Sequence, residues 1–348
     1  MSGPSAAATF GDPRDAPSGT GAVRDQPTKP RVSVVVPAYR RADLLEHTVR
    51  SLLAQDLPAA DYEIIVVDSS PDEQNLLLVR SQALQLAAGQ LQCLRKPAEG
   101  PGPSRNLGAH QAQAPLVAFI DSDCQAAPGW LRAGIAAFAD PQVGLVQGRT
   151  VPDPSAVMTS MSRSLLIETE NGLYETANMF YRRSAFEASG GFERDATPHA
   201  LQPTGGEDTD LAWRIKHQGW TSAFVPDALV MHAVLPITRG QWLVDRRFLI
   251  LPRLAARHPQ LRRQFYARYF YDEVQAWLVL GLLGTVLGAA WSPWCLLAWA
   301  PYVARRVRDR STSSWALRWL RPLLYLPRDL CTFACLLVGS LRYRALLL

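Results

Sequence analysis

The chain has 348 residues, of which 48% are hydrophobic, so it is long enough to bury one large core or two smaller ones. Residues 1–245 carry 20 Lys and Arg against 27 Asp and Glu, whereas residues 246–348 carry 16 against 4. Basic charge interleaved with long apolar runs favours an anionic membrane surface, and it argues against nucleic acid as the partner because nucleic-acid modules need no uninterrupted apolar stretch.

The first 30 residues differ in composition from the rest of the chain. Residues 1–30 are rich in Ala, Pro, Gly, Ser and Asp, and they contain no apolar run of the kind found in a signal peptide. Such a segment buries too little apolar surface to offset its loss of conformational entropy on folding. We therefore expect a disordered leader, followed by a folded domain that begins at residue 31.

The folded domain opens with a strand that ends at Pro37, Ala38 and Tyr39. An amphipathic helix follows, and then a second apolar strand at residues 62–67 that ends in Asp68. A strand–helix–strand unit brings the carboxyl ends of its two parallel strands to one edge, where open α/β sheets bind nucleotides. These four residues are therefore candidates for nucleotide binding, although Asp68 has an alternative role as the cap of the next helix.

A turn-rich segment at residues 100–108 leads into the next predicted helix and places Arg105 near its start. The N-terminus of a helix, combined with an arginine, suits an anionic phosphate group. The segment is not a Walker loop, because no Gly-Lys-Ser/Thr follows the glycines.

Two carboxylates, Asp121 and Asp123, follow the apolar strand at residues 117–120. Neighbouring carboxylates repel each other and are costly to keep ionised unless a cation or hydrogen-bond donors neutralise them. A hard divalent ion that bridges to phosphate oxygens would do so. The structural alternative is a helix cap followed by a turn.

Four segments occur in order at suitable spacing: Val-Val-Val-Pro-Ala-Tyr, Val-Val-Asp-Ser-Ser-Pro-Asp, Gly-Pro-Ser-Arg-Asn-Leu-Gly and Phe-Ile-Asp-Ser-Asp. Together they resemble the nucleotide-binding half of the family 2 glycosyltransferases of the GT-A fold, over about residues 31–235. The resemblance implies an α/β fold in which residues 31–238 form a GT-A domain with a Rossmann-like, mixed and mostly parallel sheet. Residues 239–348 are expected to form a basic, apolar, helical and membrane-associated region.

The resemblance also implies roles for individual residues. Asp68 would contact the nucleotide base, Asp121 would bound the diphosphate region, and Asp123 would hold Mg²⁺ or Mn²⁺ on the diphosphate of a nucleotide-sugar donor. In GT-A enzymes a histidine near the position of His232 sometimes completes the metal site. The family often has a second acid where this chain has Ser69.

Glu207 and Asp208 follow two glycines at the start of another predicted helix, and they resemble the catalytic-base motif of the family. We expect Glu207 to contribute to the nucleotide-sugar site and Asp208 to take the proton of the acceptor hydroxyl. Transfer with inversion needs one carboxylate opposite the departing diphosphate and a metal that stabilises the charge building on it. The alternative is structural, because acids in the first turn stabilise any helix.

These residues together predict a metal-dependent, inverting glycosyltransferase that moves a sugar from a nucleotide-sugar donor to a hydroxyl acceptor, either lipid-linked or part of an envelope glycan. One alternative is a catalytically silent, membrane-bound scaffold that binds sugar nucleotides. Another is a soluble nucleotidyltransferase, which would leave the apolar runs in residues 239–348 unexplained.

The basic C-terminal part of the chain, residues 239–348, predicts contact with a membrane. We expect residues 241–258 to form one amphipathic helix with apolar and arginine faces suited to the headgroup layer. Processive members of the family carry Gln-x-x-Arg-Trp here, and residues 241–244 do not match it, so we expect transfer of one or a few sugars.

A run without charged residues extends from Val274 to Ala304, is interrupted by Ser292 and Pro293, and has arginines on both flanks. Positive flanks favour the cytosolic side for both ends and thus a re-entrant hairpin, with a buried helix pair as the alternative. The five cysteines form no disulfide or metal spacing, which fits cytosolic exposure. We expect a protein of the cytoplasmic membrane whose catalytic domain faces the cytosol.

Overall fold

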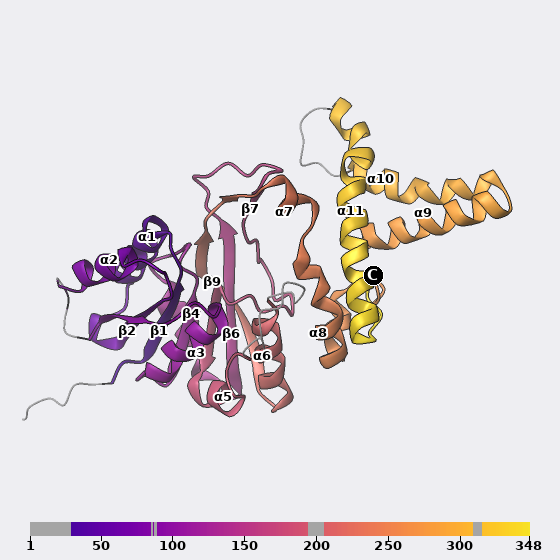
Figure 1. The fold of residues 1–348 in the computed structure, drawn as a ribbon. Coiled ribbons are helices and arrows are strands. Elements are labelled where there is room, and N and C mark those ends of the chain that lie inside the picture. The colour runs from indigo at the N-terminus through magenta and orange to yellow at the C-terminus, as the bar shows by residue number, and fades with distance from the viewer. Residues whose placement is uncertain (1–28, 85, 87–88, 194–204, 309–314) are drawn as a thin grey trace, which may run out of the picture.

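The computed structural model describes residues 29–84, 86, 89–193, 205–308 and 315–348 (Figure 1). Residues 1–28, which make up most of the expected leader, lie outside this part. A large sheet forms the centre of the N-terminal two thirds, with the strand order β3-β2-β1-β4-β8-β6-β9-β5. Its strands are β1 (Val32–Ala38), β2 (Tyr62–Asp68), β3 (Leu91–Arg95), β4 (Leu116–Ile120), β5 (Cys124–Ala126), β6 (Val143–Pro152), β8 (Asn178–Arg182) and β9 (Thr221–His232).

The sheet is mixed but mostly parallel, as the resemblance implies. The pairs β3–β2, β2–β1, β1–β4 and β6–β9 are parallel, whereas β8 runs antiparallel to both β4 and β6, and β5 runs antiparallel to β9. A separate two-stranded ladder pairs β7 (Ser162–Arg163) with β10 (Leu235–Pro236). The predicted α/β fold class is confirmed.

Helices cover both faces of the sheet, so the central strands are buried on both sides. One apolar cluster contains Val34 and packs beneath α1 (Ala42–Leu53), α2 (Gln74–Ala83) and α4 (Trp130–Ala136). The other contains Val35 and packs beneath α3 (Pro101–Gln111), α5 (Arg183–Ala188) and α6 (Glu207–His217). Each buried Val or Ile contributes about 1.5–3 kcal/mol of stabilisation, which explains why the strands are continuous apolar runs.

Helix α3 lies very close to the sheet at Gly108. A Cβ added there would lie 2.4 Å from Val35 Cγ1 and 3.2 Å from Val67 Cγ2. Real side chains do not approach to 2.4 Å, so this helix can reach its position only because residue 108 has no side chain. The close approach fixes α3 against β1 and β2.

The C-terminal region begins with short helical segments. Here α7 (Arg239–Leu243) is followed by a 3₁₀ turn at Arg246–Leu249 and by α8 (Leu251–Arg257). The expectation of one amphipathic helix at residues 241–258 is therefore wrong. The Asp245 side chain accepts a hydrogen bond from Arg247 N and starts a new turn. In α8, Leu254 is buried, and Arg257 lies 2.7 Å from Glu193 and 3.1 Å from Asp210.

Two apolar limbs then form a hairpin, which projects from the molecule in Figure 1. The limbs are α9 (Glu273–Ala290) and a 3₁₀ segment at Pro293–Trp299 that continues into α10 (Ala300–Arg308). The two limbs pack closely at Gly284, where an added Cβ would lie only 2.5 Å from Cys295 O. The break at Ser292 and Pro293 follows the sequence expectation.

The last helix, α11 (Trp315–Tyr343), crosses the base of the hairpin (Figure 1). It includes Pro322 and Pro327 in its interior. Two segments of the described chain, Glu273–Ala290 and Arg318–Tyr343, are long and apolar enough to cross a membrane by length and composition. Large apolar side chains on α9 and the hairpin tip are exposed, among them Leu283, Val286, Trp291 and Trp294.

Candidate functional site

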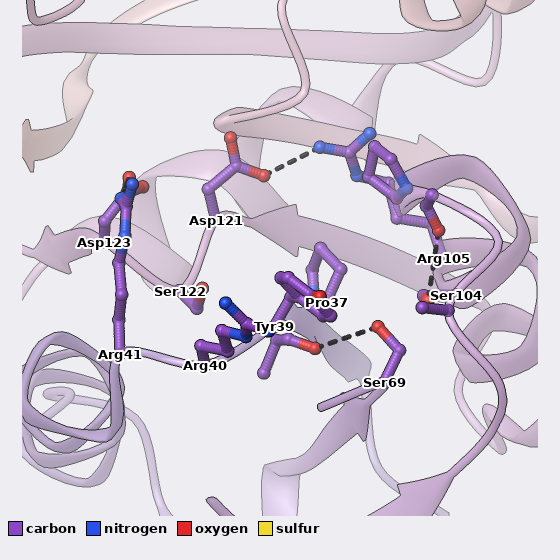
Figure 2. A pocket seen from close by; sticks show the side chains of 14 residues that line it. Pro37, Tyr39, Arg40, Arg41, Ser69, Ser104, Arg105, Asp121, Ser122 and Asp123 are labelled. Atoms are coloured by element: carbon purple, nitrogen blue, oxygen red, sulfur yellow. Dashed lines mark hydrogen bonds and ion pairs between the residues drawn. The ribbon is translucent and has the colours of Figure 1, made fainter. Parts of the chain in front are cut away.

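A cavity of about 680 Å³ opens at the carboxyl ends of β1 and β4 (Figure 2). It forms there because these parallel strands end at the same edge, next to the N-terminus of α3. Six of the residues predicted for nucleotide-sugar or metal binding line it together, namely Pro37, Ala38, Tyr39, Arg105, Asp121 and Asp123. The tertiary fold thus brings together three segments that are far apart in the sequence.

Asp68 is fully buried and does not line this cavity. Its Oδ1 accepts hydrogen bonds of 3.0 Å from Ser70 N and from Asn75 Nδ2. Its Oδ2 has no hydrogen-bond partner among the described residues and lies 3.6 Å from Arg95 Nε. The neighbouring Ser69 lines the cavity instead. Contact between Asp68 and a nucleotide base stays a prediction, while its visible role is to hold the loop after β2.

Two arginines that the sequence reasoning missed, Arg40 and Arg41, also line the cavity. Both have positive φ angles, 59° and 54°, which non-glycine residues adopt mainly where the surrounding structure imposes them. Ser70 Oγ accepts a 2.6 Å hydrogen bond from Arg40 N and helps to hold this turn. The Arg41 side chain lies 3.5 Å from Asp123 Oδ2. Only their position after Tyr39 could have singled them out in the sequence.

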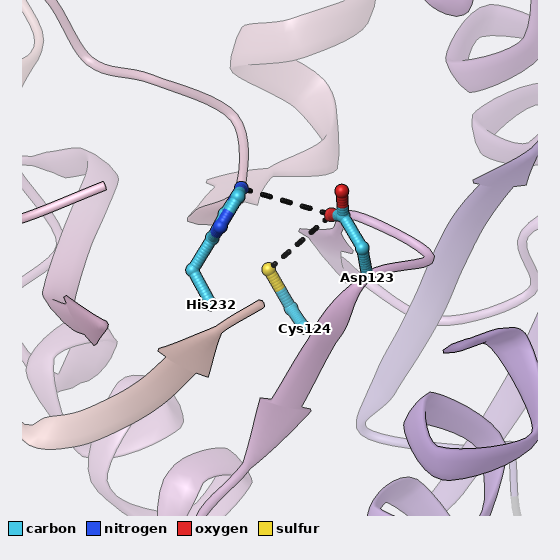
Figure 3. Close-up of side chains that lie close together, drawn as sticks. All are labelled: Asp123, Cys124 and His232. Atoms are coloured by element: carbon cyan, nitrogen blue, oxygen red, sulfur yellow. Dashed lines mark hydrogen bonds and ion pairs between the residues drawn. The ribbon is translucent and has the colours of Figure 1, made fainter. Parts of the chain in front are cut away.

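Asp123 and His232 meet because β5 pairs with β9 (Figure 3). The register places Cys124 opposite His232, and one ligand atom from each of the three residues lies within 4.8 Å of the others. His232 Nε2 is 3.7 Å from Asp123 Oδ1, and His232 Nδ1 is 2.8 Å from the carbonyl oxygen of Ala233. The backbone carbonyl can only accept, so Nδ1 carries a proton, and Nε2 is the ring nitrogen that faces Asp123.

The chemistry of these donors fits a hard divalent cation. Burial, with the nearby Asp121 and Asp123 carboxylates, raises the pKa of the Cys124 thiol well above its usual range, so this thiol stays protonated. Burial and then Asp121 also raise the pKa of Asp123, against the opposing effects of His232 and Arg41. A cation beside Asp123 would relieve this desolvation and repulsion. Carboxylate oxygens are ligands that Mn²⁺ and Mg²⁺ prefer, and a protonated thiol is not a metal ligand.

A second cavity, of about 400 Å³, adjoins the first and contains Glu207 and Asp208 in its lining. Pro101, Arg105 and Asp121 line both cavities. The buried Arg105 side chain joins them, because its Nη2 lies 2.7 Å from Asp121 Oδ1 and its Nη1 lies 3.6 Å from Glu207 Oε1. One guanidinium thus ties the end of β4 to the start of α6.

Asp208 lies in the first turn of α6, after glycines that adopt positive φ. Its Oδ1 accepts a 2.8 Å hydrogen bond from Thr209 N. Burial and then the Glu207 carboxylate raise the pKa of Asp208 to about 7, with a further contribution from Glu175 and opposition from Arg105. A carboxylate with a pKa near neutrality suits a general base.

Glu175 is an acid of this second cavity that sequence reasoning missed. Its carboxylate accepts hydrogen bonds from Asn171 Nδ2 at 3.1 and 3.2 Å and from Gln147 Nε2 at 3.3 Å. It belongs to a segment without a motif, and only the fold brings it near Asp208.

Comparison with protein families gives two matches. Residues 33–192 match the model described as glycosyl transferase family 2, and residues 116–337 match the one described as glycosyl transferase family group 2. The two matches together extend over the cavities described above and most of the C-terminal helices.

Two curated relatives are similar over much of the chain. Glycosyltransferase AglE of Haloferax volcanii is 26% identical over 63% of this chain and 76% of its own length. Pre-mycofactocin glycosyltransferase of Mycobacterium tuberculosis is 30% identical over 88% of this chain. The chain spans 62% of the length of the latter.

Two solved structures share the fold. Mannosyltransferase PcManGT from Pyrobaculum calidifontis, in complex with GDP-Man and Mn²⁺, aligns with a TM-score of 0.52 and 21% identity over 91% of this chain and 88% of its own. S. aureus TarS, in complex with UDP, aligns with a TM-score of 0.51 and 18% identity over 90% and 91%.

Proposed function

This chain belongs to the family 2 glycosyltransferases, and we propose that it transfers a sugar with inversion from a nucleotide-sugar donor to a hydroxyl of a lipid-linked or envelope-glycan acceptor. The observation that carries the proposal is the pair of adjoining cavities, one lined by Asp123 and the other by Asp208, with Arg105 and Asp121 lining both. Membership of this family favours an enzyme over a silent scaffold or a nucleotidyltransferase.

The donor side of the proposal is the first cavity. Asp123 and His232 would hold Mg²⁺ or Mn²⁺, and when bound the ion supplies positive charge that stabilises the departing diphosphate. Arg40 and Arg41 add two cationic side chains at the same cavity. A solved neighbour of the same fold was obtained with GDP-Man and Mn²⁺, and another with UDP, which supports a nucleotide-sugar donor here.

The acceptor side is the second cavity, where Asp208 accepts a proton. The acceptor oxygen attacks the anomeric carbon as the bond from that carbon to the diphosphate oxygen breaks, and the hydroxyl proton passes to the Asp208 carboxylate. A base on the face opposite the leaving group gives inversion. Arg105 would position Asp121 and Glu207, whose carboxylate oxygens lie 2.7 and 3.6 Å from its guanidinium nitrogens.

We also propose that the catalytic domain faces the cytosol at the cytoplasmic membrane. The support is the pair of long apolar helical segments and the arginines that flank the hairpin, including Arg262 and Arg263 before it and Arg305 after it.

The test is a screen of the purified chain with Mn²⁺ against a panel of nucleotide sugars, measuring release of nucleoside diphosphate. We expect release with at least one donor and its loss on chelation of the metal. The anomeric configuration of the product, measured by NMR, should be opposite to that of the donor. A product of retained configuration, or release that is indifferent to chelation, would contradict the proposal.

A further inference from the structure

Two arginines share one carboxylate at the edge of the second cavity. Arg247 Nη2 lies 2.8 Å and Arg163 Nη2 lies 3.3 Å from the same oxygen, Asp245 Oδ2. Arg247 Nε also donates to Asp245 Oδ1 at 3.0 Å. One carboxylate therefore faces two guanidinium groups, whose side chains remain 38% and 58% exposed for Arg163 and Arg247.

A third arginine, Arg328 of α11, adds to this charge. Its guanidinium lies over the ring of Trp242, 5.6 Å from the ring centroid. Burial lowers the pKa of Arg163, and the positive charges of Arg247 and then Arg328 lower it further against the opposing Asp245. Two guanidiniums therefore contact the Asp245 carboxylate, and the positive charge of a third acts on Arg163.

An unused hydrogen-bond donor accompanies these arginines. The indole N–H of Trp242 is buried and has no hydrogen-bond partner among the described residues. A buried donor without an acceptor costs free energy that a bound acceptor group would recover.

The position of this cluster connects it to the transfer reaction. Asp245 and Arg247 line the same cavity as Asp208. The rest of that cavity wall includes a set of apolar side chains from the catalytic domain and the C-terminal region: Leu165, Leu173, Phe248, Ile250, Leu251 and Leu254. The cavity therefore combines a carboxylate base, an apolar wall and a cationic edge.

We propose that the basic cluster, defined as Arg163, Arg247 and Arg328, binds a phosphate group carried by the acceptor, whose apolar part lies along this wall. The assignment to an acceptor rests on the proposed function. Phosphate is the matching anion because its charge approaches −2 and its oxygens can accept from several guanidinium forks at once. The group would share the arginines with Asp245.

The probe is decyl phosphate, which joins one phosphate to an apolar chain, titrated into the intact chain in a non-ionic detergent by calorimetry. We expect saturable binding that weakens as salt is added, whereas decanol and inorganic phosphate should each bind more weakly than decyl phosphate. Arg163→Gln and Arg328→Gln should each weaken binding by about tenfold, because each removes a charge-assisted contact.

Arg253→Gln is the matched control, since Arg253 is a similarly exposed arginine that lies 3.5 Å from Glu193 and lines neither main cavity. It should leave decyl phosphate binding unchanged. Equal weakening by this variant, or equal binding of decanol and decyl phosphate, would overturn the proposal. Tighter binding of inorganic phosphate than of decyl phosphate would overturn the part that assigns the phosphate to an apolar acceptor.

A second variant keeps the test decisive if an arginine variant fails to fold. Asp245→Asn removes the competing charge and should tighten decyl phosphate binding several-fold, because it removes a repulsive anion beside the ligand. Unchanged or weaker binding by this folded variant would count against the cluster. Binding is measured without a donor, so a failed search for nucleoside diphosphate release would overturn the proposed function and leave this result standing.

Discussion

Asp208 lies beside Glu207 and near Glu175, and burial together with these carboxylates raises its pKa to about 7. The group must be ionised to accept a proton. We therefore predict that kcat/KM rises with pH through about 7 and then levels off. A pH–rate profile measured with saturating metal checks this, and an acid limb with a midpoint near the usual Asp value would contradict the role of Asp208.

The same raised pKa predicts an effect of Asp208 on stability. A carboxyl whose folded pKa lies above its unfolded value of 3.8 destabilises the fold progressively as pH rises from 3.8 to about 7. Asp208→Asn removes this penalty, so we predict a variant with a higher Tm than the parent, by more at pH 8 than at pH 5. Thermal unfolding at both pH values measures the difference; Asp227→Asn, at an exposed position, is the control.

Several residues of the candidate site could be predicted from sequence because their types are informative where a strand or helix ends. Asp121, Asp123 and Asp208 belong to this group. Arg41 and Glu175 were missed, because an arginine or glutamate in a loop is ordinary until the fold places it against another charge. His232 could be named from the family resemblance, but its contact with Asp123 could not be predicted, because that contact depends on the register of β5 with β9.

At the scale of elements, the position of α3 depends on Gly108. A methyl group there would overlap Val35 and force the helix away from β1, so we predict that Gly108→Ala destabilises the fold by about 1–3 kcal/mol. The same shift moves Arg105 and should weaken nucleotide binding. Gly240→Ala is the control, because its Cβ would meet only Thr238 Oγ1 at 3.9 Å. Denaturant unfolding measures the free energy of unfolding of both variants, and equal values would contradict the close packing of α3.

The long buried strands could be predicted from their apolar runs in the sequence, whereas shorter elements could not be predicted in this way. Strand β5 has three residues, too few for any periodicity, and it forms because β9 offers it a partner. The prediction of one helix at residues 241–258 was wrong for another reason. An apolar face flanked by arginines fits a lipid surface, but it fits a protein surface that carries Glu193 and Asp210 equally well.

At the scale of the whole molecule, the apolar hairpin projects away from the catalytic domain (Figure 1). Trp291 and Trp294 at its tip are 87% and 78% exposed. If the hairpin enters a bilayer, replacing both with serine should weaken partitioning into vesicles by about tenfold or more, because two large aromatic groups no longer leave water. Vesicle co-sedimentation checks this against Leu84→Ser, at a position 87% exposed on the catalytic domain. Equal partitioning of all three proteins would contradict membrane insertion of the tip.

The central claim is that Asp123 and Asp208, from two distant segments, serve the two sides of one transfer. The direct measurement compares Asp123→Asn with Asp208→Asn for Mn²⁺-dependent binding of the donor found in the screen, by calorimetry, and for sugar transfer. Asp208→Asn should bind the donor as the parent does while transfer falls by about 10²–10⁴-fold. Asp123→Asn should lose the Mn²⁺-dependent part of donor binding. Normal transfer by Asp208→Asn, or undiminished Mn²⁺-dependent binding by Asp123→Asn, would contradict the account.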